Sequence, residues 1–149
     1  MMTRQTMLRT TVAAGLLALG LAGCGHMQAS NTTHLHAALS GSQEVPPKGG
    51  AGKGEADVEL NTANNTVSWK VSYSGLSGPA TAGHIHGPAA PGANAGVMVP
   101  FPSVASSTFQ GQATVTPAQA AAIASGQTYV NIHTAANPGG EIRGQLTKM

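Results

Sequence analysis

The feature that most constrains the fold is a strict alternation of apolar and polar residues from residue 67 to residue 73. Val67, Trp69, Val71 and Tyr73 alternate with serine and lysine, which puts the four apolar side chains on one face of a β-strand. Shorter alternating runs recur about every ten residues between Gly, Pro and Asn turns. The expected strands lie within residues 35–39, 56–60, 67–73, 82–86, 97–101, 108–115, 128–133 and 141–146. This pattern predicts an all-β domain, a Greek-key sandwich or barrel.

One short helix is expected within residues 117–125. Thr116 can cap its start, Pro117 suits its first position, and an alanine-rich run continues it to Gly126, which favours its end. Such a short helix is only marginally stable in water. We therefore expect it to pack against the sheet.

The first residues resemble a bacterial lipoprotein signal peptide. Arg4 and Arg9 precede an uncharged, mostly apolar run that is too short to span a membrane. The run ends in Leu21-Ala22-Gly23-Cys24, which resembles the lipobox, where the cysteine thiol accepts a diacylglyceryl group. Cys24 is also the chain's one cysteine, which excludes an internal disulfide and a thiolate metal cluster. The alternative is an ordinary signal peptide with a chance cysteine.

The chain is therefore expected to have three parts: a signal peptide (1–23), a small, polar tether (24–33) and one domain (34–149). Gly25 after the lipidated cysteine favours the outer membrane over the inner membrane of the cell envelope. Beyond the signal peptide the chain has five basic and five acidic residues. It has no basic stripe with aromatic residues, so we expect no nucleic-acid partner.

The histidines are the strongest candidates for functional chemistry. Two His-x-His pairs, His34/His36 and His84/His86, fall on expected strands, where residues i and i+2 share a face with Cα atoms about 6.5–7 Å apart. Two such imidazoles can converge on one metal ion. His133 has the same outward register in a later strand, so we predict a site of His84, His86 and His133. His34 or His36 can supply a further ligand.

Nitrogen ligands without a thiolate suit Cu(II), Zn(II) or Ni(II), and Cu(II) binds most tightly of these. Copper is the expected cofactor, with zinc as the alternative. Met98 is a candidate axial ligand, although its pattern fits a core residue better, and His26 is expected to be solvated. The alternative for each histidine is a polar surface residue. Ligands are favoured because charge is scarce, and the six histidines outnumber the five acidic residues.

Patterns typical of catalysis are absent from the sequence. It contains neither a Gly-x-Ser-x-Gly motif nor a phosphate-binding glycine loop. Its five acidic residues also argue against a calcium site. Enzymatic activity stays open, but the sequence favours a binding module.

Four segments together resemble the CHRD family, named after repeats in chordin. They are residues 39–47, residues 74–76 with 83–88, residues 126–134 and residues 138–146. The segments follow the family's order and extend over residues 34–147. The resemblance implies an extracytoplasmic β-sandwich domain and says little about activity.

Three charged residues, Glu44, Glu141 and Arg143, belong to these CHRD-like segments. We expect them to hold the long loops, through an ion pair or by capping backbone groups. The alternative is that one of the carboxylates orients a metal-binding histidine without contacting the metal itself.

A second resemblance, to Cu,Zn superoxide dismutase, rests on Gly75-Leu76 followed by His84-Ile85-His86-Gly87. It implies His84 and His86 as copper ligands, with His133 as the later copper-binding histidine. The chain lacks an evident bridging histidine, a zinc-site cluster and a cysteine pair, which argues against dismutase activity. Together the two resemblances imply a superoxide-dismutase-like or immunoglobulin-like fold.

Three functions are consistent with the sequence. The first is a lipid-anchored copper module that sequesters the ion or passes it on. The second is a non-enzymatic cell-surface interaction module without a metal, and the third is a copper redox enzyme. The expected partners of the first are the metal ion and, through the N-terminal lipid, the membrane.

Overall fold

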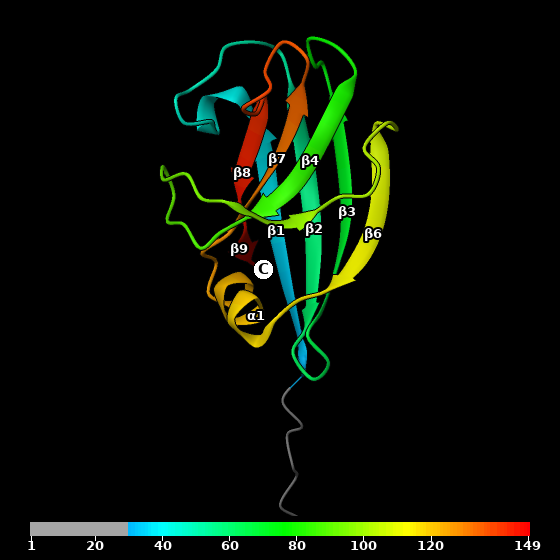
Figure 1. The fold of residues 1–149 in the computed structure, drawn as a ribbon, viewed down its shortest axis with the longest axis vertical. Helices are drawn as coiled ribbons and strands as arrows, with labels where there is room; N and C mark the ends of the chain where they lie inside the picture. Colours follow the sequence, from blue (N-terminus) through cyan, green and yellow to red (C-terminus); the bar gives the residue numbers. More distant parts are fainter. Residues whose placement is uncertain (1–29) are drawn as a thin grey trace, which may run out of the picture.

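The computed structural model describes residues 30–149, and its strands form one antiparallel sheet that curls into a nearly closed barrel (Figure 1). The strands are β1 (Thr32–Ser40), β2 (Lys53–Asn61), β3 (Thr66–Ser74), β4 (Ala80–His86), β5 (Val97–Pro100), β6 (Thr108–Thr114), β7 (Tyr129–Thr134), β8 (Ile142–Gln145) and β9 (Thr147–Lys148). The helices are η1 (Gly41–Gln43), a 3-10 turn, and α1 (Pro117–Ala124). The all-β prediction with one short α-helix is confirmed.

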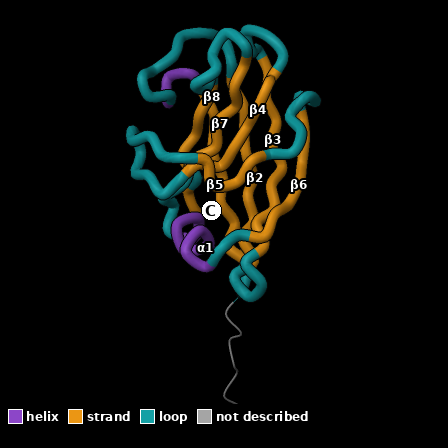
Figure 2. The backbone as a smooth tube through the Cα atoms, viewed as in Figure 1, coloured by secondary structure: helices purple, strands orange, loops and turns teal. Residues whose placement is uncertain are grey.

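The order of the strands shows how the sheet divides. Neighbouring strands run β5-β4-β7-β8-β1-β2-β3-β6, and β9 adds a short pairing to β1. We call β1, β2, β3 and β6 the first half-sheet, and β5, β4, β7 and β8 the second half-sheet. The chain crosses between the halves after β3, β5 and β6 (Figures 1 and 2). Such crossings are typical of Greek-key connectivity and not of a simple meander.

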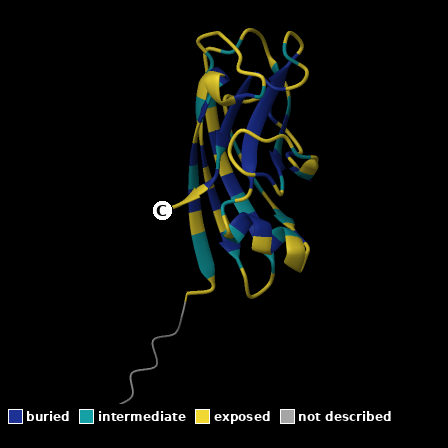
Figure 3. Ribbon diagram, turned by 90° about the vertical axis from the view of Figure 1, so that its left-hand side faces the viewer, coloured by how far each residue is buried: buried dark blue, intermediate teal, exposed yellow. Residues whose placement is uncertain are grey.

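The interior is built from the alternating residues of the strands. Val67, Trp69 and Val71 on β3 are buried, with their polar neighbours on the outer face. Figure 3 shows buried and exposed positions along the strands that face the viewer. The Trp69 ring lies 4.8 Å from the Phe101 ring, centroid to centroid. Gly111 on β6 pairs directly with Trp69, and a Cβ atom there would lie 2.7 Å from the indole Cζ2. The absence of a side chain at residue 111 therefore makes room for the indole.

Helix α1 begins and ends where the sequence predicts. The Thr116 side chain accepts a hydrogen bond from the Gln119 amide and the Gln119 side chain accepts one from the Thr116 amide, which completes a capping box. Gly126 follows the helix with a φ of 73°, a conformation that glycine adopts at little cost. The buried Ile123 and Ala120 attach α1 to the core at the lower end of the barrel (Figure 2).

The N-terminal boundary of the domain differs from the sequence-based one. β1 begins at Thr32, so residues 32 and 33, which the sequence analysis assigned to the tether, belong to the first strand. The reason is pairing, since Thr32 lies opposite Asn61 and Thr33 opposite Leu60 on β2. The predicted signal peptide, His26 and the Cys24 lipidation site lie outside the described residues. Within residues 30–149 no helix has the length and apolar character of a membrane span.

Replacing Gly111 with alanine tests the packing of the indole. The new methyl group would overlap the Trp69 ring, so we expect the free energy of unfolding to fall by about 1–3 kcal/mol. Urea denaturation followed by the emission of Trp69, the chain's one tryptophan, measures this. Gly78→Ala is the control, because a Cβ atom there meets nothing within 4 Å. Equal stability of the two variants would contradict the packing argument.

Candidate metal centre

The three predicted ligands lie on the two adjacent strands β4 and β7. His84 and His86 are on β4, and His133 is on β7 opposite Ala82. Ile85 lies between His84 and His86 on β4, and Ile132 directly precedes His133 on β7. Both isoleucines are fully buried in the core. The histidine side chains therefore project from the outer face of the second half-sheet, as the alternation predicts.

This outer face is not open to solvent. The loop of residues 87–96, between β4 and β5, extends over β7 and β8 (Figure 1). His86 contacts this loop at Ala95, and His133 contacts the β7–β8 turn at Pro138. Both histidines are only 8% exposed, whereas His84 is half-buried. The alternative of ordinary surface histidines thus does not describe His86 or His133.

The three imidazoles form a tight triangle. One ring nitrogen from each lies within 4.8 Å of the others, and His84 Nδ1 is 3.0 Å from His133 Nε2. The ring centroid of His84 lies 5.2 Å from that of His86 and 4.8 Å from that of His133. The structure thus brings the predicted trio together at a spacing that small side-chain rotations would close around one ion.

Two of the rings are held in a defined tautomer. His86 Nδ1 lies 3.0 Å from the Ala95 carbonyl oxygen, and His133 Nδ1 lies 2.9 Å from that of Pro138. A carbonyl only accepts, so each Nδ1 carries the hydrogen and each neutral ring keeps a lone pair on Nε2. This is how a metal-binding histidine is usually oriented, with one nitrogen held by an outer partner.

The lone pair on His86 Nε2 lacks a donor, and the lone pair on His133 Nε2 has His84 Nδ1 as its one donor, at 3.0 Å. His86 Nε2 is buried and has no hydrogen-bond partner. His133 Nε2 is 2.9 Å from Asn131 Oδ1, which puts two acceptors in contact in this amide orientation. A cation between the rings would satisfy these groups, and three imidazoles without a thiolate or carboxylate suit copper or zinc. The residues present fit such an ion.

The rings are also kept neutral. Burial, together with the charges of His133 and His86, lowers the pKa of His84 from 6.5 to about 4. Burial likewise lowers the pKa of His86, although the Ala95 carbonyl opposes the shift. Neutral imidazole is the form that binds a metal, so these two rings need not lose a proton at neutral pH before an ion binds.

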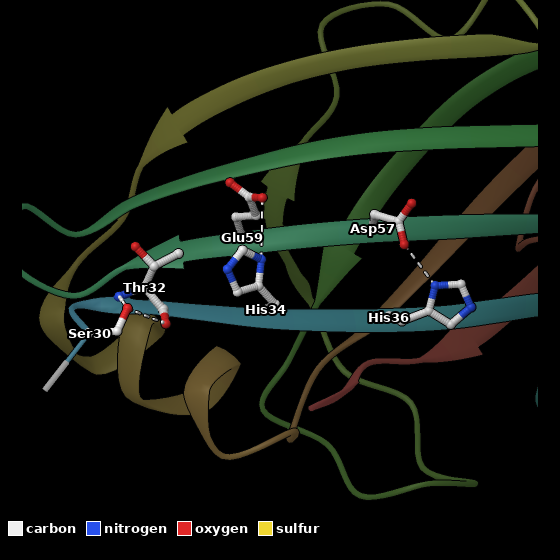
Figure 4. Close-up of polar contacts among 6 residues, drawn as sticks. All are labelled: Ser30, Thr32, His34, His36, Asp57 and Glu59. Carbon is white, nitrogen blue, oxygen red and sulfur yellow. Dashed lines mark hydrogen bonds and ion pairs between the residues drawn. The ribbon is translucent and has the colours of Figure 1, made fainter. Parts of the chain in front are cut away.

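The other His-x-His pair lies elsewhere on the barrel. On the outer face of the first half-sheet, His34 Nδ1 is 3.3 Å from Glu59 Oε1 and His36 Nδ1 is 2.8 Å from Asp57 Oδ1 (Figure 4). β8 separates β1 from β7, and the histidine triangle includes neither residue. The structure does not bring His34 or His36 to the main site, because β1 does not adjoin β4 or β7 in the sheet.

Met98 belongs to the hydrophobic packing, as its pattern favoured. Its side chain is partly buried against the core cluster, and its Cε lies 3.1 Å from where a Gly87 Cβ would be. The described contacts thus give Met98 a packing role.

Glu141 fastens two loops. Its carboxylate accepts hydrogen bonds from the Ser77 amide (2.7 Å), the Ser77 hydroxyl (2.6 Å) and the Thr134 hydroxyl (2.5 Å). Burial alone would raise the pKa of Glu141, but the bonds from Ser77 and Thr134 outweigh it and lower that pKa. Glu141 thus ties the β3–β4 loop to the β7–β8 turn, and its oxygens bond to these groups and not to a histidine.

Glu44 and Arg143 are buried close to the histidines. Burial raises the pKa of Glu44, against the opposing charge of Arg143. The guanidinium donates to Ala93 O and Asn94 Oδ1. The ion pairs found among residues 30–149 involve neither Glu44, Glu141 nor Arg143. Glu141 and Arg143 hold loops through hydrogen bonds, which include one from the Ser77 amide and one to the Ala93 carbonyl. Glu44 Oε1 is buried without a hydrogen-bond partner.

Two residues of the site were missed from the sequence. Asn131 and Tyr129 share the outer face of β7 with His133, and both are 3% exposed. Asn131 contacts His133, and the Tyr129 ring stacks on His86. Their spacing of i, i+2 and i+4 with His133 could have placed them on the same strand face as His133. The spacing does not reveal that a loop would bury them.

The lowered pKa of His84 predicts a pH-dependent stability in the metal-free protein. Below pH 6.5 the unfolded chain binds a proton at His84, whereas the folded chain does so only near pH 4. The unfolded state then holds more protons, so the free energy of unfolding should fall as pH decreases from about 6.5 to about 4. Urea denaturation across this range, compared with His84→Gln, measures the effect. The same pH slope in both proteins would contradict it.

One of the comparisons with known proteins identifies a family. The family model of the CHRD domain matches residues 35–146, which include every histidine and charged residue of the site described above. No curated protein and no solved structure is a significant match. Since the match spans most of the chain and nearly all of its described part, the protein belongs to the CHRD domain family.

Proposed function

We propose that this protein is a metal-binding module of the cell envelope, with copper as its ion. His84, His86 and His133 would hold the ion through neutral imidazole nitrogens, and the protein would sequester it or pass it on. The observation that carries the proposal is the buried His86 Nε2, which has no partner and whose ring is fixed by the Ala95 carbonyl.

The chemistry of the three ligands favours copper. Three nitrogens with no anionic ligand satisfy Cu(I) or Cu(II), and among divalent ions copper binds such sites most tightly. Zinc is the alternative ion. His84 is half-exposed while His86 and His133 are buried, so an ion would enter and leave on the His84 side. That accessibility suits storage or transfer.

The proposed location rests on the N-terminal sequence. Leu21-Ala22-Gly23-Cys24 would direct cleavage and lipidation, which would anchor the domain at the outer membrane. A short polar segment would then connect the lipid to Thr32, where β1 begins. Such an anchor would keep the copper site outside the cytoplasm.

A second candidate function, an interaction module without a metal, is favoured by one observation. His84 Nδ1 lies at hydrogen-bond distance, 3.0 Å, from His133 Nε2, so two of the rings can satisfy each other in a purely structural network. In that case the histidines would stabilise the covered face, and the binding surface would lie elsewhere.

Copper titration of the full chain separates the two functions. In a Cys24→Ser background, which removes the one thiol, we expect one tight copper ion per chain and nitrogen hyperfine structure in the Cu(II) EPR spectrum. His86→Ala should weaken binding by about 100-fold or more, beyond what loss of an outer partner costs. Competition with a chelator of known affinity gives the constants.

The control is His34→Ala/His36→Ala, which removes the other His-x-His pair. It should leave the tight ion in place. Wild-type affinity in the His86→Ala variant would overturn the copper proposal and favour the interaction module.

A further inference from the structure

A guanidinium, a phenol ring and an imidazole form one continuous stack behind the histidine triangle. Arg143 Cζ on β8 lies 3.4 Å from the centroid of the Tyr129 ring on β7. The other face of this phenol is available to His86 on β4, whose ring is parallel to it within 2° at 4.9 Å. All three residues are at most 8% exposed. The stack restricts the plane of the His86 ring.

The same guanidinium also holds the loop that sets the His86 tautomer. Arg143 Nη2 donates to the Ala93 carbonyl at 2.7 Å, and Nη1 donates to Asn94 Oδ1 at 2.9 Å. The next residue, Ala95, accepts the hydrogen bond of His86 Nδ1. The Ala95 amide and carbonyl also meet the Tyr129 hydroxyl, at 3.2 and 3.3 Å. Two separate routes therefore lead from Arg143 to His86.

A structural role alone does not account for the free-energy cost of burying this arginine. Burying a cation is costly unless hydrogen bonds and an opposite charge compensate, and no carboxylate forms an ion pair with Arg143 within residues 30–149. The two hydrogen bonds of its guanidinium go to residues 93 and 94, next to Ala95. Apart from the charge interaction with the nearby Glu44 carboxyl, the interactions that offset the burial of Arg143 are thus the ones that orient His86.

We propose that Arg143 is a positioning residue that holds His86 Nε2 toward the metal, through the Tyr129 ring and through residues 93–95. The inference rests on the proposed metal function. Without the guanidinium, the His86 ring turns and exchanges tautomers, so its lone pair faces the ion for only part of the time. Loss of such an outer partner typically weakens metal binding by about 10–100-fold.

The first test is a thermodynamic cycle on copper affinity with Arg143→Met, which keeps much of the side-chain length and removes the charge. We expect Arg143→Met to weaken binding by about 10–100-fold in the wild-type background. In a His86→Ala background it should have no further effect, because its route to the ion is gone. The same loss in both backgrounds would overturn the proposal and leave a general structural role.

The second test needs no metal. Long-range ¹H–¹⁵N NMR of the metal-free protein should show His86 as the pure Nδ1–H tautomer, and Arg143→Met should give a mixture. If the wild-type protein binds no copper but the tautomer still changes, the metal function fails and the positioning role stands. An unchanged tautomer overturns the positioning role, whatever the copper affinity.

Two further variants distinguish a specific effect of Arg143 from simple misfolding. Asn94→Ala removes one acceptor of Arg143 from an exposed loop residue, and should weaken copper binding in the same direction but less. Lys70→Met makes the same charge change on the exposed outer face of the first half-sheet, and should leave binding and tautomer unchanged. An effect of Lys70→Met equal to that of Arg143→Met would contradict a specific role for Arg143.

Discussion

The hydrogen bond from His86 Nδ1 to the Ala95 carbonyl links the barrel to the loop that covers it. A β-barrel normally buries its apolar interior and leaves polar groups on its outside. Here the 87–96 loop and the β7–β8 turn create a second buried layer on the outer face of the second half-sheet, and this layer is polar. Buried polar groups destabilise a protein unless they are paired. The carbonyls of Ala95 and Pro138 supply that pairing for two histidines, and the buried His86 Nε2 keeps a lone pair without a partner.

The two His-x-His pairs show how strongly burial changes the chemistry of one sequence pattern. His34 and His36 have the same strand spacing as His84 and His86, yet their Nδ1 atoms face the exposed acids Glu59 and Asp57 (Figure 4). Ion pairs of this kind between exposed groups contribute little to stability. His86 is screened from water and has a lowered pKa because of burial. The spacing makes convergence possible, but the loop above the strand decides whether the imidazoles act as a group.

The sequence predicts this protein best where local rules decide the outcome. Alternation predicted the strands and the inward direction of Ile85 and Ile132, and the cap at Thr116 with Gly126 predicted the helix. The grouping of His84, His86 and His133 followed from strand geometry together with a resemblance. The burial of this trio and the contacts of Arg143 were not predictable in the same way. They depend on where the 87–96 loop folds back, and no periodic pattern encodes that position.

The loop and the proposed metal site are thermodynamically coupled, because they share the same contacts. Closing the loop fixes the His86 ring, so an ion that binds this ring must also favour the closed loop, and the coupling is reciprocal. A partner that displaced residues 93–95 would free His86 and weaken the buried side of the site first. The half-exposed His84 would remain to hand the ion over. In the proposed function, release of the ion would then be controlled from the loop, at a distance from the exposed ligand itself.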